Sequence, residues 1–172
     1  MNTPLPYRLV ALDADGTLFG EDLVVRPAVR EAIRQAQKQG VLVTVATGRA
    51  FVGARIAAQQ INACLPLICY QGGVIQHAET EEVIYQATFP RALVPELVAW
   101  ARAKNAHITF YVNNVIYLEE QRYADRFYDQ WFGLPRRVGK DVVQEVPGDP
   151  IKFLIIGEPS DLDLLQPDLE SR

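Results

Sequence analysis

The fold of this chain is decided by the stretch Tyr7-Arg8-Leu9-Val10-Ala11-Leu12-Asp13-Ala14-Asp15-Gly16-Thr17-Leu18. Its first half is short and almost continuously apolar, which is typical of a buried strand in a parallel sheet. The strand is predicted to lead directly into the Asp-x-Asp-Gly loop. Residues two apart in an extended chain point the same way, so Asp13 and Asp15 are expected to present their carboxylates to one place. Gly16 permits a sharp turn and lets backbone amides approach an anion there.

The residues that follow this stretch alternate between helix and strand patterns. Apolar spacing, a proline at the start and a glycine just past the end predict a helix over 27–39. Apolar runs predict strands over 41–46 and 65–70, with a helix over 50–60 between them. Strand, helix, strand, helix, strand indicates the α/β class, here a partial Rossmann-like parallel sheet with right-handed crossovers.

The pattern changes after Gly72-Gly73 and indicates a separate α+β module inserted after the parallel sheet. β-branched and aromatic residues favour strands there, and apolar spacing favours helices. We expect strands over 83–89, 108–118 and 151–157, helices over 91–104 and 121–132, and a turn-rich connection over 133–149. The predicted division is one domain over 1–78 and a second over 79–172.

The two carboxylates of the first loop indicate a metal site. Like charges placed so close together are costly unless a cation or a proton relieves them, and a hard divalent ion prefers oxygen ligands. Mg²⁺ held by Asp13 and Asp15 is therefore the expected cofactor. The alternative is a plain acidic turn, because Asp-Gly pairs are common in turns.

A second polar loop, Ala46-Thr47-Gly48-Arg49, follows the strand predicted over 41–46. The carboxyl ends of neighbouring parallel strands meet at one edge of the sheet, where open α/β sheets bind ligands. Thr47 is either a helix cap or a phosphate ligand on this pattern alone. The guanidinium of Arg49 suits a phosphate at the same edge.

Together, the two loops resemble the first and second motifs of the haloacid dehalogenase-like (HAD) superfamily. The resemblance implies that Asp13 is the nucleophile that forms an aspartyl-phosphate. It implies that Asp15 protonates the leaving group and later activates water, and that Thr47 binds the phosphoryl group. Gly16, Gly48 and Arg49 join Thr47 as the expected phosphate-binding residues.

The string Val43-Thr44-Val45-Ala46-Thr47-Gly48-Arg49 is similar to the Cof-type branch of that superfamily. The branch often has Asn-Gly-Ala after its third strand, where this chain has Gln71-Gly72-Gly73. In terms of the resemblance, 1–78 is an incomplete HAD core and 79–172 is a C-terminally incomplete α/β cap that selects the substrate. The chain ends before the lysine and the acidic pair of the third and fourth motifs, which predicts weaker Mg²⁺ binding and slower catalysis.

Composition excludes several classes of protein. Seventeen basic against 21 acidic residues give a net charge of -4, which leaves no electrostatic footprint for nucleic acid. No apolar stretch approaches the roughly 20 residues of a membrane span, and the start of the chain lacks a signal-peptide core. A cytoplasmic enzyme is therefore expected. In the usual strand order of the HAD superfamily, a fourth core strand lies beside the first strand. The resemblance implies that this fourth strand is missing here, so the first strand would have an exposed apolar edge, which predicts a homo-oligomer through that edge.

The leading hypothesis is a Mg²⁺-dependent phosphomonoester hydrolase that acts on a small phosphorylated metabolite such as a sugar phosphate. One alternative is a catalytically impaired remnant that binds a metal or a partner chain. Another is a phosphomutase or phosphotransferase that uses the same aspartyl-phosphate. His77 and His107 lie in no metal-ligand or catalytic spacing, so surface or core roles are expected for them.

Overall fold

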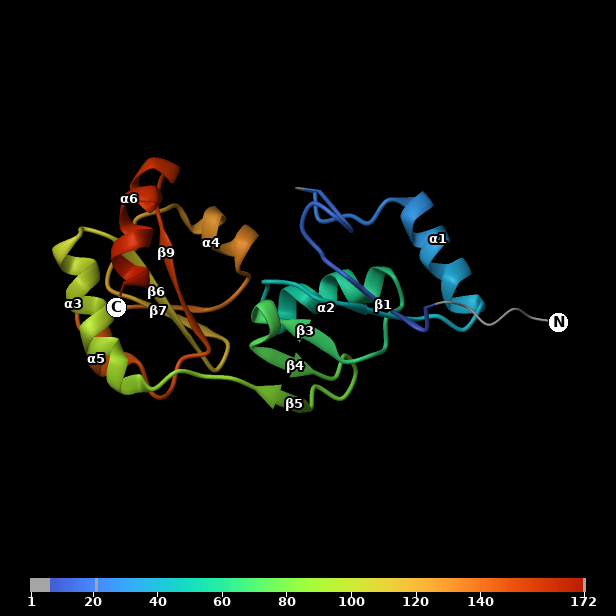
Figure 1. Ribbon diagram of the computed structural model, residues 1–172, viewed down its shortest axis with the longest axis horizontal. Helices are drawn as coiled ribbons and strands as arrows, with labels where there is room; N and C mark the ends of the chain where they lie inside the picture. The colour runs from blue at the N-terminus through green and yellow to red at the C-terminus, as the bar shows by residue number, and fades with distance from the viewer. Residues whose placement is uncertain (1–6, 21, 172) are drawn as a thin grey trace. The chain divides into compact units, whose positions relative to one another are not determined.

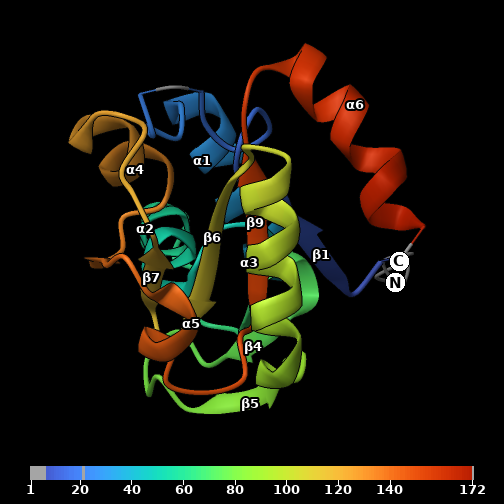
Figure 2. The ribbon, with the colours of Figure 1, turned by 90° about the vertical axis from the view of Figure 1, so that its left-hand side faces the viewer.

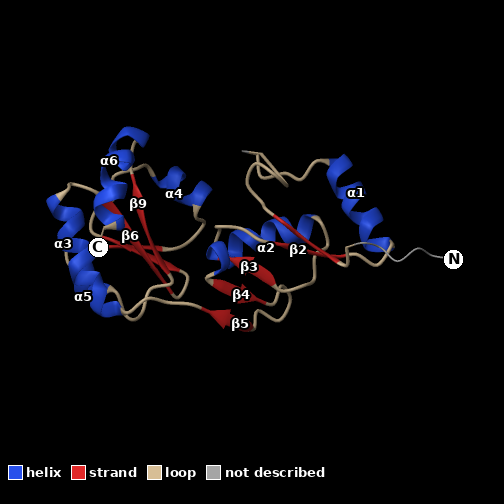
Figure 3. Cartoon of the chain, in the orientation of Figure 1, coloured by secondary structure: helices blue, strands red, loops and turns tan. Residues whose placement is uncertain are grey.

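The computed structural model describes residues 7–20 and 22–171 (Figures 1 and 3). The chain divides into two compact units. The first comprises Met1–Ala87 with Trp131–Gly133, and the second comprises Thr88–Gln130 with Leu134–Arg172. Among the described residues, no helix is long and apolar enough to cross a membrane.

The first unit begins with the predicted alternation of strands and helices. Its elements in chain order are β1 (Leu9–Leu12), α1 (Pro27–Lys38), β2 (Leu42–Val45), α2 (Phe51–Gln60), β3 (Leu67–Cys69), the short 3₁₀ helix η1 (Tyr70–Gly72), β4 (Val74–Gln76) and β5 (Val83–Gln86). β1 and β2 are parallel in register, and a parallel bridge between Ala46 and Ile68 connects β2 with β3. The α/β class with a parallel sheet is therefore confirmed.

The core of the first unit lies where α2 packs on β2 and β3. Alanines on α2 let the helix approach the strands closely, and valine and leucine side chains from the strands fill the contact. The fully or nearly fully buried members are Val45, Ala54, Ala57, Ala58 and Leu67. This packing sets the direction in which the chain continues beyond the end of β2.

β1 is less buried than a central parallel strand. Leu9 is 54% exposed, and exposed and half-buried residues alternate along the strand. Among the described strands β1 pairs only with β2, so its other edge has no neighbouring strand. The prediction of a buried strand is therefore wrong along β1, none of whose residues is buried, whereas its position after the prolines and before Asp13 is correct.

The division between the units differs from the predicted one at 78/79. β5 was expected in the second domain, but it pairs antiparallel with β4, which in turn pairs with β3. The first unit therefore continues to Ala87. The reason is a local hairpin: β4 and β5 follow each other closely in sequence, and pairing neighbours is the least costly way to satisfy their backbone groups.

The second unit is a four-stranded sheet with helices packed on it. Its elements are η2 (Arg91–Leu93), α3 (Val94–Ala103), β6 (His107–Val112), β7 (Val115–Leu118), α4 (Asp125–Trp131), β8 (Arg136–Val138), α5 (Val142–Glu145), β9 (Lys152–Ile156) and α6 (Pro159–Glu170). The strand order is β8-β7-β6-β9. Its core joins α3 and α5 to one face of the sheet through Val98, Trp100, Phe110, Tyr117 and Val142 (Figure 2).

Two expectations for the second unit need correction. The single strand expected over 108–118 is a hairpin, because Asn113 and Asn114 both adopt positive φ and form a two-residue turn. Such turns favour asparagine, so the sequence did contain the signal. The connection expected over 133–149 contains β8, parallel to β7, and α5, whose first turn is capped by Asp141.

Candidate functional site

The loop after β1 presents both aspartates to solvent around a buried alanine. Asp13 and Asp15 are exposed, whereas Ala14 between them is fully buried. The Ala14 carbonyl accepts hydrogen bonds from the amides of Leu18 (3.0 Å) and Phe19 (3.2 Å), which winds the loop tightly around it. Both carboxylates are therefore accessible to a ligand, on either side of the buried Ala14.

Gly16 is the residue that allows this tight loop. Its φ is +73°, in the left-handed region that glycine adopts without a Cβ penalty. Its amide donates to the carbonyl of Phe19 at 2.9 Å. The hydroxyl of Thr17 lies 3.5 Å from Oδ2 of Asp13, so the loop contributes a neighbouring hydroxyl to the first carboxylate.

The loop after β2 is built around Thr47, which is 4% exposed. The Thr47 amide donates to Ile68 (2.9 Å), and its carbonyl accepts from the Gln71 amide (3.0 Å). Its hydroxyl accepts from the Arg49 amide at 3.2 Å, just before α2 begins. The helix-cap alternative for Thr47 is therefore wrong, because the N-cap residue of α2 is Ala50 and no side chain caps it. A hydroxyl that accepts one bond still has its own hydrogen to donate to a ligand.

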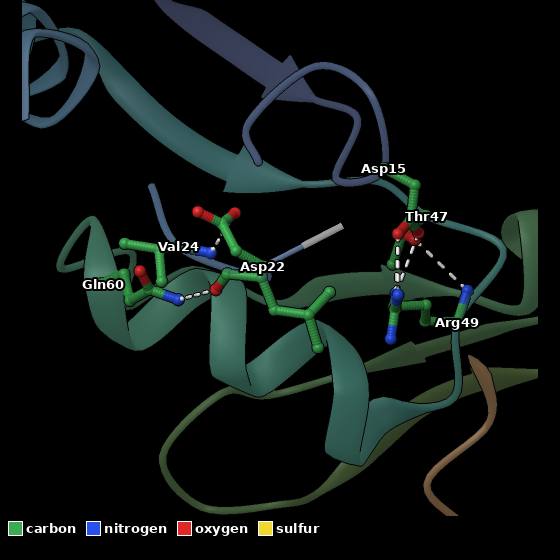
Figure 4. Close-up of polar contacts among 7 residues, drawn as sticks. Asp15, Asp22, Val24, Thr47, Arg49 and Gln60 are labelled. Carbon is green, nitrogen blue, oxygen red and sulfur yellow. Dashed lines mark hydrogen bonds and ion pairs between the residues drawn. The ribbon is translucent and has the colours of Figure 1, made fainter. Parts of the chain in front are cut away.

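Arg49 connects the two loops (Figure 4). Its Nε donates to Oδ2 of Asp15 at 2.8 Å, and its Nη2 donates to Oδ1 at 2.7 Å. This is the two-pronged geometry in which arginine binds carboxylates and phosphates. The structure therefore brings Asp15 and Arg49 together across 34 residues of sequence, a contact that the sequence did not predict.

A strained turn after β3 contacts the loop that follows β2. Tyr70, Gln71 and Gly72 have φ values of 51°, 55° and 93° in succession. Left-handed backbone at two non-glycine residues is unfavourable and persists only where the surroundings enforce it. The Gln71 side chain lies against Gly48, where an added Cβ would meet it at 3.4 Å. Gly72-Gly73 marked a turn in the sequence, but nothing in the sequence indicated a strained Tyr70-Gln71 pair.

A glutamine fastens the segment that follows the first loop. Gln60, at the end of α2, donates through Nε2 to the Leu23 carbonyl (2.9 Å) and accepts through Oε1 from the Val25 amide (2.8 Å). Val25 also forms an antiparallel bridge with Phe19. One side chain thus pairs with the loop as a neighbouring strand would; Figure 4 shows the bond that Gln60 donates. Sequence reasoning missed this residue because a glutamine near a helix end has no distinctive pattern.

The oxygen donors available for Mg²⁺ come from the first loop. Mg²⁺ is usually bound by one or two carboxylates together with water and substrate phosphate oxygens, so the Asp13 carboxylate and oxygens of Asp15 fit in kind. No group of three or more His, Cys, Asp or Glu side chains with metal-binding geometry occurs among residues 7–20 and 22–171. Asp168 accepts a hydrogen bond from the Trp100 indole at 2.8 Å, which joins α6 to α3.

Comparisons with known proteins identify relatives of this chain. The sequence profile of the haloacid dehalogenase-like hydrolases matches residues 10–172. A phosphoglycolate phosphatase of Methanopyrus kandleri is 36% identical over 75 residues, which are 44% of this chain and 32% of that protein. A 5-amino-6-(5-phospho-D-ribitylamino)uracil phosphatase of Bacillus subtilis is 28% identical over 103 residues, or 59% of this chain and 38% of that protein.

Solved structures extend the similarity over nearly the whole chain. A haloacid dehalogenase-like hydrolase of Bacteroides thetaiotaomicron superposes with a TM-score of 0.74 at 26% identity, covering 95% of this chain and 63% of the other. The chain spans about a third of the length of the curated relatives it matches.

Proposed function

Because the chain belongs to the haloacid dehalogenase-like hydrolase family, we propose that it acts as a phosphatase, with Asp13 as the nucleophile, Asp15 as the acid and base, and Mg²⁺ as the cofactor. The observation that supports this most is the exposure of both aspartates at the carboxyl end of β1, with Arg49 from the β2 loop bonded to the second of them. An acidic turn alone would not require a neighbouring loop to supply a cation.

The proposed reaction uses the side chains in two steps. A carboxylate oxygen of Asp13 attacks phosphorus, the bond between phosphorus and the ester oxygen breaks, and Asp15 gives its proton to the departing oxygen. Asp15 then takes a proton from water as the water oxygen attacks the aspartyl-phosphate. Inorganic phosphate leaves and Asp13 is restored. We propose that the Thr47 hydroxyl and backbone amides near Gly48 donate to the phosphoryl oxygens, whereas the Gly16 amide already donates to the Phe19 carbonyl.

The Asp13 carboxylate and the Asp15 backbone carbonyl are the groups we propose to hold Mg²⁺. When bound, Mg²⁺ supplies positive charge that offsets the repulsion between the Asp13 carboxylate and the phosphoryl oxygens. Asp15 uses its carboxylate for proton transfer, so its backbone carbonyl is the better donor to a cation.

The proposed substrate is a phosphomonoester of a small metabolite, of the kind that a Cof-type sugar phosphatase would take. The relatives named above are phosphatases of phosphoglycolate and of a phosphoribityl compound, both of which are small phosphorylated molecules. The reacting group of such substrates is the terminal phosphate, which the first unit can bind without recognising the rest of the molecule.

Hydrolysis of p-nitrophenyl phosphate with Mg²⁺ tests the proposal, with Asp13→Asn as the control. Asparagine keeps the shape of the side chain and removes its nucleophilic oxygen charge, so we expect the rate to fall by about 10³-fold or more. Equal rates for the two proteins would contradict the proposed function. Release of a phosphorylated alcohol rather than inorganic phosphate, with an acceptor alcohol present, would indicate a phosphotransferase instead.

A further inference from the structure

Arg49 is held in place by several neighbours besides its carboxylate partner, among them Tyr70, whose amide donates to the Arg49 carbonyl at 3.0 Å. Its guanidinium carbon lies 5.7 Å from the centre of the Phe19 ring, which is buried. Its stem runs along α2 at Gly53, where a Cβ would lie 3.1 Å from Cδ of Arg49. Its amide donates to Thr47. These contacts leave the Arg49 side chain only 10% exposed, so the position of its guanidinium is set by packing.

Asp15 is the more exposed member of the pair. Its side chain is 43% exposed, whereas that of Arg49 is 10% exposed. Rotation of the Asp15 side chain into solvent would break the contact without disturbing the buried surroundings of Arg49. Opening of the ion pair by movement of Asp15 is therefore less costly than opening by movement of Arg49.

The two proposed roles of Arg49 compete for the same atoms. A phosphoryl group would be bound through a pair of N–H donors on one edge of the guanidinium. In the structure the Nε and Nη2 donors on one edge already point at the oxygens of Asp15 (Figure 4). Two anions cannot occupy that edge together, because each would need the same hydrogens and they would repel each other.

We propose that Arg49 is an exchange site: it holds Asp15 in the ligand-free molecule and releases it when the phosphoryl group of the substrate takes the Nε and Nη2 edge. This inference rests on the proposed function and adds to it the coupling between phosphate binding and Asp15. Asp15 is released from Arg49 only when a phosphoryl group is bound. The side chain proposed to protonate the leaving group therefore becomes available when a substrate is present.

Binding of inorganic phosphate to the full chain tests the exchange, measured by isothermal titration calorimetry on four proteins. They are the wild type, Asp15→Asn, Arg49→Met and the double variant. Methionine keeps much of the buried stem of Arg49 and removes its donors, and circular dichroism checks that each variant is folded. A matched control is Glu81→Gln, because Arg55, the partner of Glu81, also lies over an aromatic ring in the same unit.

We expect Asp15→Asn to bind phosphate about 3- to 10-fold more tightly than the wild type, since the competitor for Arg49 is weakened. In the Arg49→Met background the same change is expected to gain less than about 2-fold. The Glu81→Gln control is expected to bind like the wild type.

Two results would overturn the inference. The first is an equal gain from Asp15→Asn in both backgrounds, which would mean that the substitution acts only by removing a negative charge. The second is the absence of phosphate binding in both the wild type and Asp15→Asn. Failure of the proposed function is a separate result, namely hydrolysis that does not depend on Asp13. A non-additive binding cycle alongside such hydrolysis would leave the exchange standing.

Discussion

His107 makes the second unit sensitive to acid. Its ring is 4% exposed at the start of β6, its Nε2 lies 2.7 Å from the hydroxyl of Tyr128, and the Tyr123 ring is 5.7 Å away between centroids. Burial, reinforced by the positive charge of Arg122, lowers the pKa of His107 to about 4. The neutral ring is therefore favoured in the folded protein far below the ordinary pKa of about 6.5.

The sign and size of the effect follow from proton linkage. Between pH 6.5 and 4 the unfolded chain binds a proton at His107 that the folded chain does not, so acid favours unfolding. The contribution of neutral His107 is fully present above pH 6.5 and is lost as the pH falls toward 4. The difference between the two pKa values corresponds to about 3 kcal/mol of unfolding free energy across that range.

Nuclear magnetic resonance measures the midpoint directly through the His107 ring protons, and we expect no titration step for them above about pH 5. Unfolding by guanidinium chloride at several pH values measures the free energy of unfolding. Carboxylates also titrate in this range, so the comparison is with His107→Gln, which keeps a hydrogen-bonding side chain and cannot be protonated. The free-energy difference between the two proteins should change by about 3 kcal/mol from pH 7 to pH 4. A His107 midpoint near 6.5, or a difference independent of pH, would refute this account of its burial.

Three further predictions concern stability. Gln60→Leu removes the side-chain hydrogen bonds to the loop after Asp15 and should lower the unfolding free energy by about 1–3 kcal/mol in a urea titration. The control is Gln59→Leu at the exposed neighbouring residue, which should change the unfolding free energy by less than about 0.5 kcal/mol. Gln71→Asn places a residue that tolerates left-handed backbone at the strained turn. The melting temperature should rise by an amount that corresponds to about 0.5 kcal/mol of unfolding free energy. A lower melting temperature would show that the contact of Gln71 with Gly48 outweighs the strain. Asp168→Ala leaves the indole of Trp100 without its acceptor. Amide hydrogen exchange in α6 should become about 5- to 30-fold faster. Unchanged exchange would mean that α6 is held by its apolar contacts alone.

The local structure of the first loop could be predicted because it depends on neighbouring residues. Asp13 and Asp15 are both exposed around the buried Ala14, and Gly16 supplies the positive φ that the turn requires. The helix over Pro27–Lys38 was predicted for the same reason, since a proline opens it and Gly40 closes it. The family resemblance rested on these local features too.

Contacts between distant residues could not be predicted in this way. Arg49 was expected to face a phosphate. Only the parallel pairing of β1 with β2, which brings the loops after them to one edge of the sheet, shows that Arg49 bonds to Asp15. Similarly, the pairing of β5 with β4 rather than with the second unit depends on which strand edges are available once β3 and β4 have paired.

The sequence by itself determined the identity and order of the proposed site residues Asp13, Asp15 and Thr47. The tertiary structure alone decided that the Asp15 carboxylate pairs with Arg49. The physical reason is that side-chain type and backbone period are properties of consecutive residues. Pairing of a carboxylate with a guanidinium, by contrast, depends on the distance between two loops, which packing of α2 against β2 and β3 sets.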